Sequence, residues 1–180
     1  GRRERRRRIG GRELDLGRRR ISFVGGHLGI RQVADRLRGA QNAVDEVYGA
    51  SLEVIDSEGL TVPHGRSVGE ALRDRAACAR PEAVFAVNGI LQALTMLGEV
   101  RVPQDVALIG YDDIDFAAAT VVPLSSIRQP SMLIGSTAVD LLLREAAGGA
   151  EFVREQIVFQ PELVVRASTS QEKRSTVRIP

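Results

Sequence analysis

The sequence predicts an α/β fold built around a parallel sheet, and two observations carry this prediction. From Ile21 onward, short apolar runs alternate with amphipathic segments, which is the order of βαβ units. The run VALIG at 106–110 is continuously apolar and rich in β-branched residues, as in a strand buried on both faces of a parallel sheet. With 180 residues, of which 43% are hydrophobic, the chain is long enough to bury a core.

Most of the predicted elements lie between residues 21 and 110. In order these are strand 21–26, helix 31–47, strand 52–56, helix 67–79, strand 83–87, helix 90–97 and strand 106–110. Apolar residues recur at steps of three and four in the first helix, at Val33, Leu37, Ala40, Val44 and Val47. The second helix is predicted to turn its apolar residues inward, namely Val68, Ala71, Leu72, Ala76 and Ala79. Its Cys78 is interpreted as a small core residue.

After Pro123 the pattern changes. LSSIRQ (124–129) alternates as a short strand does, and Pro130 then begins a helix that ends near Ala147, before two glycines. The stretch that follows is predicted to be extended and broken at Pro161, because proline cannot donate to a strand ladder.

The charge of +2 is concentrated at one end of the chain. Seven arginines lie in the first dozen residues, at positions 2, 3, 5, 6, 7, 8 and 12. Such a block suits phosphate binding to nucleic acid, but no aromatic residue accompanies it, so a solvated tail is the preferred interpretation. No apolar run is long enough for a membrane span, and the arginines lack the apolar block of a secretory signal, so a cytoplasmic protein is expected.

A ligand site is predicted where the strand 106–110 ends, at Tyr111, Asp112 and Asp113. Parallel sheets bind ligands beyond the carboxyl ends of their strands. Sugars and polyols present hydroxyls that both donate and accept hydrogen bonds. Asp112 can accept two of them, Arg36 offers a planar fork of donors, and Asn88 and Gln129 both donate and accept.

Each of these residues also has a structural interpretation. Arg36 would equally pair with Asp35 or Asp112, and Asn88, which precedes Gly89, would serve as a helix cap or turn residue. Gln129, before a proline, would satisfy backbone groups. The neighbouring acids Asp113 and Asp115 are predicted to cap the short helix that follows rather than to contact ligand.

Several segments together resemble the effector-binding half of a LacI-type transcriptional regulator. They are GRRRISFVGG (17–26), RLRGA (36–40), PEAVFAVN (81–88), GYDD (110–113) with PLSSIRQP (123–130), and PELVVRAST (161–169). The resemblance implies a periplasmic-binding-protein-like fold, of which this chain holds the carboxyl-terminal lobe and part of the second lobe. Arg36, Asn88, Asp112 and Gln129 match the family's ligand-contacting arginine, asparagine, aspartate and glutamine.

The resemblance also implies partners and a division of the chain. It implies a sugar-like effector held between two lobes, a homodimer, and DNA contact through a helix-turn-helix that has no counterpart in this chain, which is therefore expected to be truncated. The expected parts are a basic disordered tail (1–16), an effector-binding domain (17–169) with crossover segments at 124–161, and a flexible tail (170–180). Without its partner lobe, the helix from Pro130 is predicted to expose an apolar patch or to form a dimer contact.

Two departures from the family pattern leave the ligand class open. Gly89 stands where the family has an acid after the asparagine, and Leu60 stands near a position that is often aromatic in sugar-binding relatives. Only 4% of the residues are aromatic, so a stacking surface for a sugar ring is expected to be poor.

Other functions fit the residues less well. The acids Asp112, Asp113 and Asp115 could hold Mg²⁺ for phosphoryl transfer, but the one lysine is Lys173, far from the body of the chain. Nucleophile-elbow and Rossmann glycine motifs are lacking, and His27 and His64 are isolated loop residues by this interpretation, so no enzyme, metal or cofactor is expected. An exported sugar-binding protein would need a secretory signal. A dimerisation fragment that binds no ligand remains an alternative.

Overall fold

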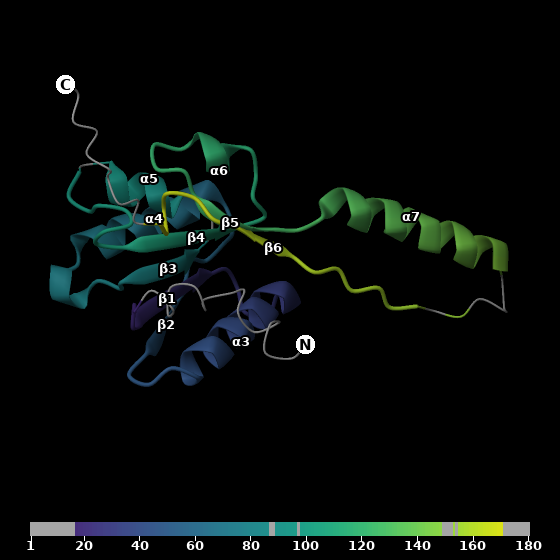
Figure 1. The fold of residues 1–180 in the computed structure, drawn as a ribbon, viewed down its shortest axis with the longest axis horizontal. Coiled ribbons are helices and arrows are strands. Elements are labelled where there is room, and N and C mark those ends of the chain that lie inside the picture. Colours follow the sequence, from purple (N-terminus) through teal and green to yellow (C-terminus); the bar gives the residue numbers. More distant parts are fainter. Residues whose placement is uncertain (1–16, 87–88, 97, 149–152, 154, 171–180) are drawn as a thin grey trace, which may run out of the picture.

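The computed structural model describes residues 17–86, 89–96, 98–148, 153 and 155–170. The described strands form a single six-stranded sheet in the order β2-β1-β3-β4-β5-β6, in which only β6 runs antiparallel to its neighbour (Figure 1). The strands are β1 (Arg20–Gly25), β2 (Ser51–Asp56), β3 (Ala83–Ala86), β4 (Ala107–Tyr111), β5 (Ser125–Arg128) and β6 (Glu162–Val164). The helices are α3 (Arg31–Asp45), α4 (Val62–Asp74), η1 (Ala77–Ala79, a 3₁₀ turn), α5 (Ile90–Thr95), α6 (Phe116–Ala119) and α7 (Ser131–Gly148). The predicted α/β class and parallel sheet are confirmed.

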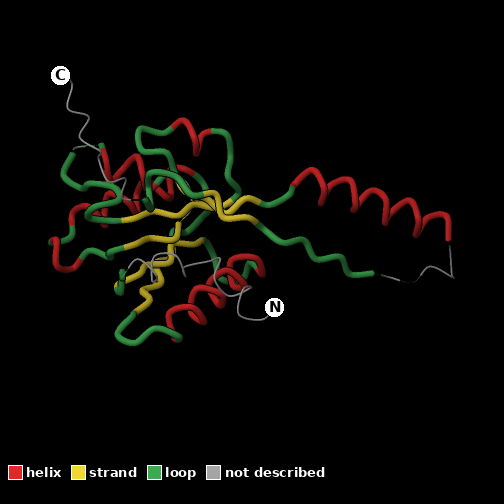
Figure 2. The backbone as a smooth tube through the Cα atoms, viewed as in Figure 1, coloured by secondary structure: helices red, strands yellow, loops and turns green. Residues whose placement is uncertain are grey.

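Helices cover both faces of the sheet, because successive side chains of each strand point to opposite faces. Phe23 and Phe85 pack on one face with Val33 and other residues of α3. Val24 and Leu108 point to the other face, into the apolar cluster that α4 and α5 complete. Thus α3 lies on one face of the sheet, and α4 and α5 lie on the other (Figure 2).

The second predicted helix differs from the structure in its bounds and in its buried face. α4 begins at Val62 and ends at Asp74, so His64 is helical rather than in a loop. Its buried residues are Gly65, Gly69 and Leu72, whereas the alanines at 71, 76 and 79 are exposed. Cys78, predicted to be in the core, is also exposed. The reason is close packing on α5: a Cβ on Gly69 would lie 2.6 Å from that of Ala93, so the contact runs through glycines that the apolar pattern ignored.

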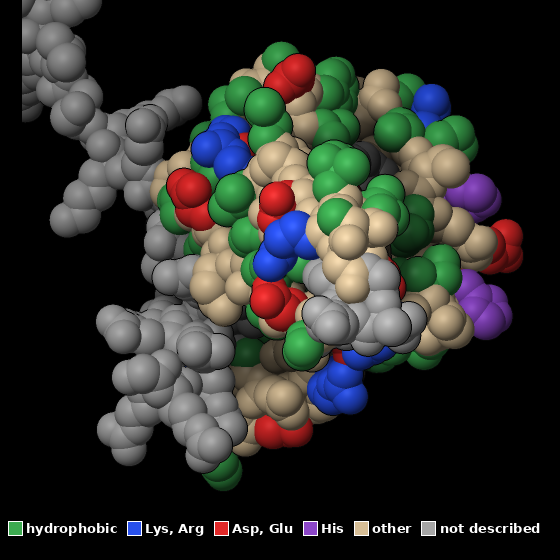
Figure 3. Space-filling model, turned by 90° about the vertical axis from the view of Figure 1, so that its right-hand side faces the viewer, with side chains coloured by type: hydrophobic (Ala, Val, Ile, Leu, Met, Phe, Trp, Pro, Cys, Tyr) green, Lys and Arg blue, Asp and Glu red, His purple; other side chains and the backbone are tan. Residues whose placement is uncertain are grey.

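α7 and the extended segment that follows it project from the rest of the molecule (Figure 1). We call α7 together with residues 153 and 155–161 the arm, and the rest of the described chain the body. None of the residues of α7 is buried, and Met132 and Leu142 are 88% and 64% exposed. Seen from the end toward which the arm extends, apolar side chains lie exposed beside charged ones (Figure 3). The predicted exposed apolar patch is confirmed.

None of the helices within the described ranges is long and apolar enough to cross a membrane. The two predicted tails fall outside the described residues, apart from Ser170.

Candidate functional site

The candidate site lies at the carboxyl end of the sheet, between β1 and β3. The strand order 2-1-3-4-5 reverses direction at this pair, and such a switch point opens a crevice that ligands occupy in doubly wound sheets. A hollow of about 70 Å³ is found there. Its lining comes from β1, α3, the loop after β2, β3 and the end of β4: Phe23, Val24, Gly25, Val33, Arg36, Leu60, Phe85, Ala86, Tyr111 and Asp112.

Asp112 brings the predicted site residues together. Its carboxylate accepts a hydrogen bond from Nε2 of Gln129 at 2.7 Å, and a guanidinium nitrogen of Arg36 lies 3.9 Å from the same oxygen. The Asp112 side chain is 53% exposed, so it is presented to solvent at the rim of the hollow. Three of the four predicted residues thus form one polar group, while Asn88 lies outside the described residues. Their contact with a ligand remains a prediction.

Arg36 is held by an aromatic ring rather than by the neighbouring acid on its helix. Its guanidinium carbon lies 3.4 Å from the centroid of the Tyr111 ring, a stacked cation–π arrangement. Asp35, one of the two acids offered as an alternative partner, pairs instead with Arg31 and Arg38. The other alternative, Asp112, is within ion-pair distance of Arg36.

Three of the seven aromatic residues of the chain meet at this place. Phe23 and Phe85 lie with ring centroids 5.5 Å apart, and Phe85 contacts Tyr111 edge-on at 6.2 Å. All three line the hollow. The low aromatic content therefore did not indicate how apolar this site is, because composition carries no information about where residues meet.

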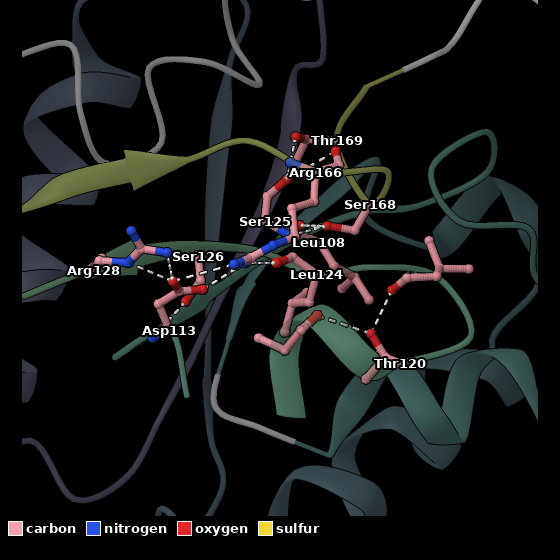
Figure 4. Close-up of polar contacts among 12 residues, drawn as sticks. Leu108, Asp113, Thr120, Leu124, Ser125, Ser126, Arg128, Arg166, Ser168 and Thr169 are labelled. Carbon is pink, nitrogen blue, oxygen red and sulfur yellow. Dashed lines mark hydrogen bonds and ion pairs between the residues drawn. The ribbon is translucent and has the colours of Figure 1, made fainter. Parts of the chain in front are cut away.

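The capping role predicted for Asp113 and Asp115 is wrong. Asp115 stands at the N-cap of α6, but its side chain accepts no capping hydrogen bond. The Asp113 carboxylate instead forms ion pairs with Arg128 at 2.6 Å and with Arg166 at 2.5 Å (Figure 4). The hydrogen bond from Arg166 is the largest cause that lowers the pKa of Asp113, and Arg128 adds to it.

Sequence reasoning did not identify Arg128 and Arg166. Arg128 directly precedes the predicted site residue Gln129, and that adjacency was the available signal. Arg166 lies 53 residues beyond its partner, a distance at which the sequence pattern gives no pairing.

Within the described ranges, no group of three or more histidine, cysteine or acidic side chains is arranged to hold a metal ion. The Mg²⁺ alternative requires Asp113 as a ligand, but both of its carboxylate oxygens face arginines. The Asp113 carboxylate is therefore not placed to bind Mg²⁺ together with Asp112 and Asp115.

Comparison with known proteins agrees with this geometry. Residues 13–169 match the family described as periplasmic binding protein-like domain. The chain belongs to that family, in the form found as the effector domain of LacI-type regulators.

Named relatives give the detail. The regulator MalR of Streptomyces coelicolor is 34% identical over 87% of this chain and 47% of its own length. The ribose operon repressor of Haemophilus influenzae is 32% identical over 86% of this chain and 47% of its own. A solved complex of the regulator CelR with cellobiose superposes with a TM-score of 0.77 at 29% identity, covering 92% of this chain and 51% of that one. The LacI-type effector domain described here thus spans about half the length of the curated relatives it matches, and those relatives are transcription regulators rather than enzymes.

Proposed function

We propose that this chain is the effector-sensing portion of a LacI-type transcriptional regulator, and that Arg36, Asn88, Asp112 and Gln129 contact a sugar or a related small polar molecule. The observation that carries the proposal is the meeting of Arg36 and Gln129 on the Asp112 carboxylate, at the switch point of the sheet. A fork of donors, an amide and an exposed carboxylate match adjacent hydroxyl groups. The relative solved with cellobiose supports the ligand class.

The described residues form one wall of such a site. Small-molecule pockets usually enclose roughly 300–1,000 Å³, whereas the hollow beside Asp112 holds about 70 Å³. The arm leaves from the same edge of the sheet, because Gln129 is followed by Pro130 and α7. The proposed mechanism follows: an effector bridges this wall and a second one, and so favours a closed arrangement of the two.

The remaining partners follow from the same assignment. We place DNA contact in the part of such a regulator that this chain does not cover. A cytoplasmic location is supported by the relatives, which are transcription regulators.

A homodimer is supported by a second surface of the body. An apolar groove of about 520 Å³ lies between α5, α6 and residues 120–124, and none of its lining residues is charged within the described ranges. Phe116 and Val121 line the groove and are 63% and 94% exposed. Two copies related by a two-fold axis can pair through such a surface, because the protruding apolar side chains of each copy can enter the groove of the other.

Sedimentation of the native chain and of a Phe116→Glu variant tests the dimer. The expected result is a dimer that Phe116→Glu converts to a monomer, while Leu142→Glu on the arm leaves it intact. A monomeric native chain would refute this part of the proposal.

Ligand binding is tested by recording backbone amide NMR spectra during titration with cellobiose, sucrose, glucose and ribose. One sugar should shift the amides of Asp112, Gln129 and Arg36 in the native chain, and Asp112→Ala should remove those shifts while the sheet stays folded. Asp115→Ala is the matched control and should respond as the native chain does. Shifts that persist in Asp112→Ala would show that the site lies elsewhere.

The alternative, a dimerisation fragment that binds no ligand, gives a different result in the same two experiments. It predicts a dimer by sedimentation and unchanged spectra with all four sugars.

A further inference from the structure

We propose that Asp113 is a positioning residue whose carboxylate fastens both strands that connect the body to the arm, and that it thereby fixes the arm's direction and the turn that presents Asp112. The part that concerns Asp112 as a ligand contact rests on the proposed function. The part that concerns the arm stands on the geometry alone.

The chain leaves the body through β5 and returns through β6, and both strands are tied to one carboxylate. Arg128, the last residue of β5, donates from Nε to Oδ2 of Asp113 at 2.7 Å. Arg166, two residues after β6, donates from a terminal guanidinium nitrogen to Oδ1 at 2.5 Å. We call Asp113, Arg128 and Arg166 the Asp113 cluster (Figure 4). The two strands that support the arm therefore share an anchor at the end of β4.

The Asp113 cluster is itself tied into the body. Arg166 donates a second hydrogen bond to the carbonyl oxygen of Leu124 at 2.7 Å, and its backbone N–H donates to the Ser125 hydroxyl at 2.8 Å. The Ser125 hydroxyl also lies 2.7 Å from that of Thr169, and both residues are buried. The segment that follows β6 is thus fixed to β5 and to the residue before it. Arg166, which pairs with Asp113, is therefore held in place by the body.

The backbone at this turn adopts a conformation that needs such support. Asp112 and Asp113 have φ angles of 73° and 46°, in the left-handed region that residues with side chains rarely adopt. The Asp113 N–H donates to the Ser126 hydroxyl at 3.0 Å, which adds to the ion pairs in holding the turn. Gln129 adjoins Arg128 and Asp112 adjoins Asp113, so the contact between Asp112 and Gln129 lies directly beside the Asp113 cluster.

The side chains of the two adjacent acids differ in their exposure to solvent. The Asp113 side chain is 2% exposed, whereas that of Asp112 is 53% exposed. A carboxylate as buried as Asp113 is tolerated only when cations compensate it, so the cluster holds together as a unit. Asp112 is left facing solvent, where a ligand can reach it.

The arm's direction can be measured with spin labels, one on the body and one on α7. Cys78 is exposed and is the sole cysteine of the chain, so it takes the first label. A Ser136→Cys substitution at an exposed position of α7 takes the second. Double electron–electron resonance then gives the distribution of distances between the body and the arm.

Asp113→Asn is the test variant, because asparagine has nearly the same size and tolerates the left-handed backbone but carries no charge. The expected result is a distribution at least twice as wide as that of the native chain, with the circular dichroism of a folded sheet. Asp115→Asn is the control, since that neighbouring side chain caps no backbone group, and it should give the native width.

A folded Asp113→Asn variant with the native width would overturn the proposal. If that variant does not fold, Arg128→Gln is used instead, since the Arg128 side chain is 49% exposed and its loss is better tolerated. The width should then increase, and an unchanged width would again overturn the proposal. Both measurements are made without ligand, so a failure of the sugar titrations would refute the proposed function and leave this result unaffected.

Discussion

The body and the arm contain similar apolar side chains in opposite surroundings. In the body, Leu94 in α5 is fully buried and Ile127 in β5 is 1% exposed. In the arm, Leu142 and Leu143 are each 64% exposed, although α7 is the longest helix among the described residues. An apolar helix can bury its side chains against other segments. Its apolar content does not show that the described residues supply those segments. Three predictions test this contrast, beginning with the largest expected effect.

The first prediction compares one leucine from each region. Leu94→Ala should lower the free energy of unfolding by about 2–5 kcal/mol, because it removes a fully buried side chain and leaves a cavity. Leu142→Ala should change it by less than about 0.5 kcal/mol, as is usual for exposed positions. Urea denaturation of both variants measures the difference. Similar losses for the two would mean that the arm is packed in solution.

The second prediction concerns the point where the two regions join. Asp113→Asn should lower the free energy of unfolding by about 2 kcal/mol. This is less than the roughly 3–5 kcal/mol expected when one partner of a fully buried ion pair is removed, because Arg128 is half exposed. Asp140→Asn, on the arm, pairs with the exposed Arg144 and should cost under about 1 kcal/mol.

The Asp113 effect should also depend on pH. Its two arginines hold the pKa of the Asp113 carboxyl below the value of the unfolded chain, which is about 3.9. The stabilisation is therefore fully present above about pH 5 and is lost as the pH falls through the folded-state pKa. Unfolding curves of the native chain and Asp113→Asn should converge on acidification. A gap that stays constant down to pH 2 would show that charge is not the cause.

The third prediction compares two helical glycines. At Gly69 a Cβ would lie 2.6 Å from that of Ala93 and 3.0 Å from the carbonyl oxygen of Ile90, so Gly69→Ala should destabilise the body by about 1–3 kcal/mol. At Gly135 in α7 nothing lies within 4 Å, so Gly135→Ala should stabilise that helix by about 0.5–1 kcal/mol. Circular dichroism at 222 nm during urea titration follows both, and opposite signs are expected.

The order of strands and helices could be predicted because it depends on local periodicity, as at Val33, Ala40 and Val44. The place of Asp112 could be predicted because a strand end fixes it. What could not be predicted depends on contacts between distant segments: the packing of Gly69 on α5, and the ion pair between Asp113 and Arg166. The adjacent acids Asp112 and Asp113 look alike in sequence, and only the folded chain separates their roles.

Hydrogen–deuterium exchange followed by mass spectrometry most directly tests the contrast between a body with a buried core and an arm that is not packed against it. Amides of β3 and β4 should exchange only through global unfolding, while those of α7 should exchange at least a hundredfold faster. Protection of α7 equal to that of β4 would contradict the claim and would mean that the arm's apolar surface is already covered in solution.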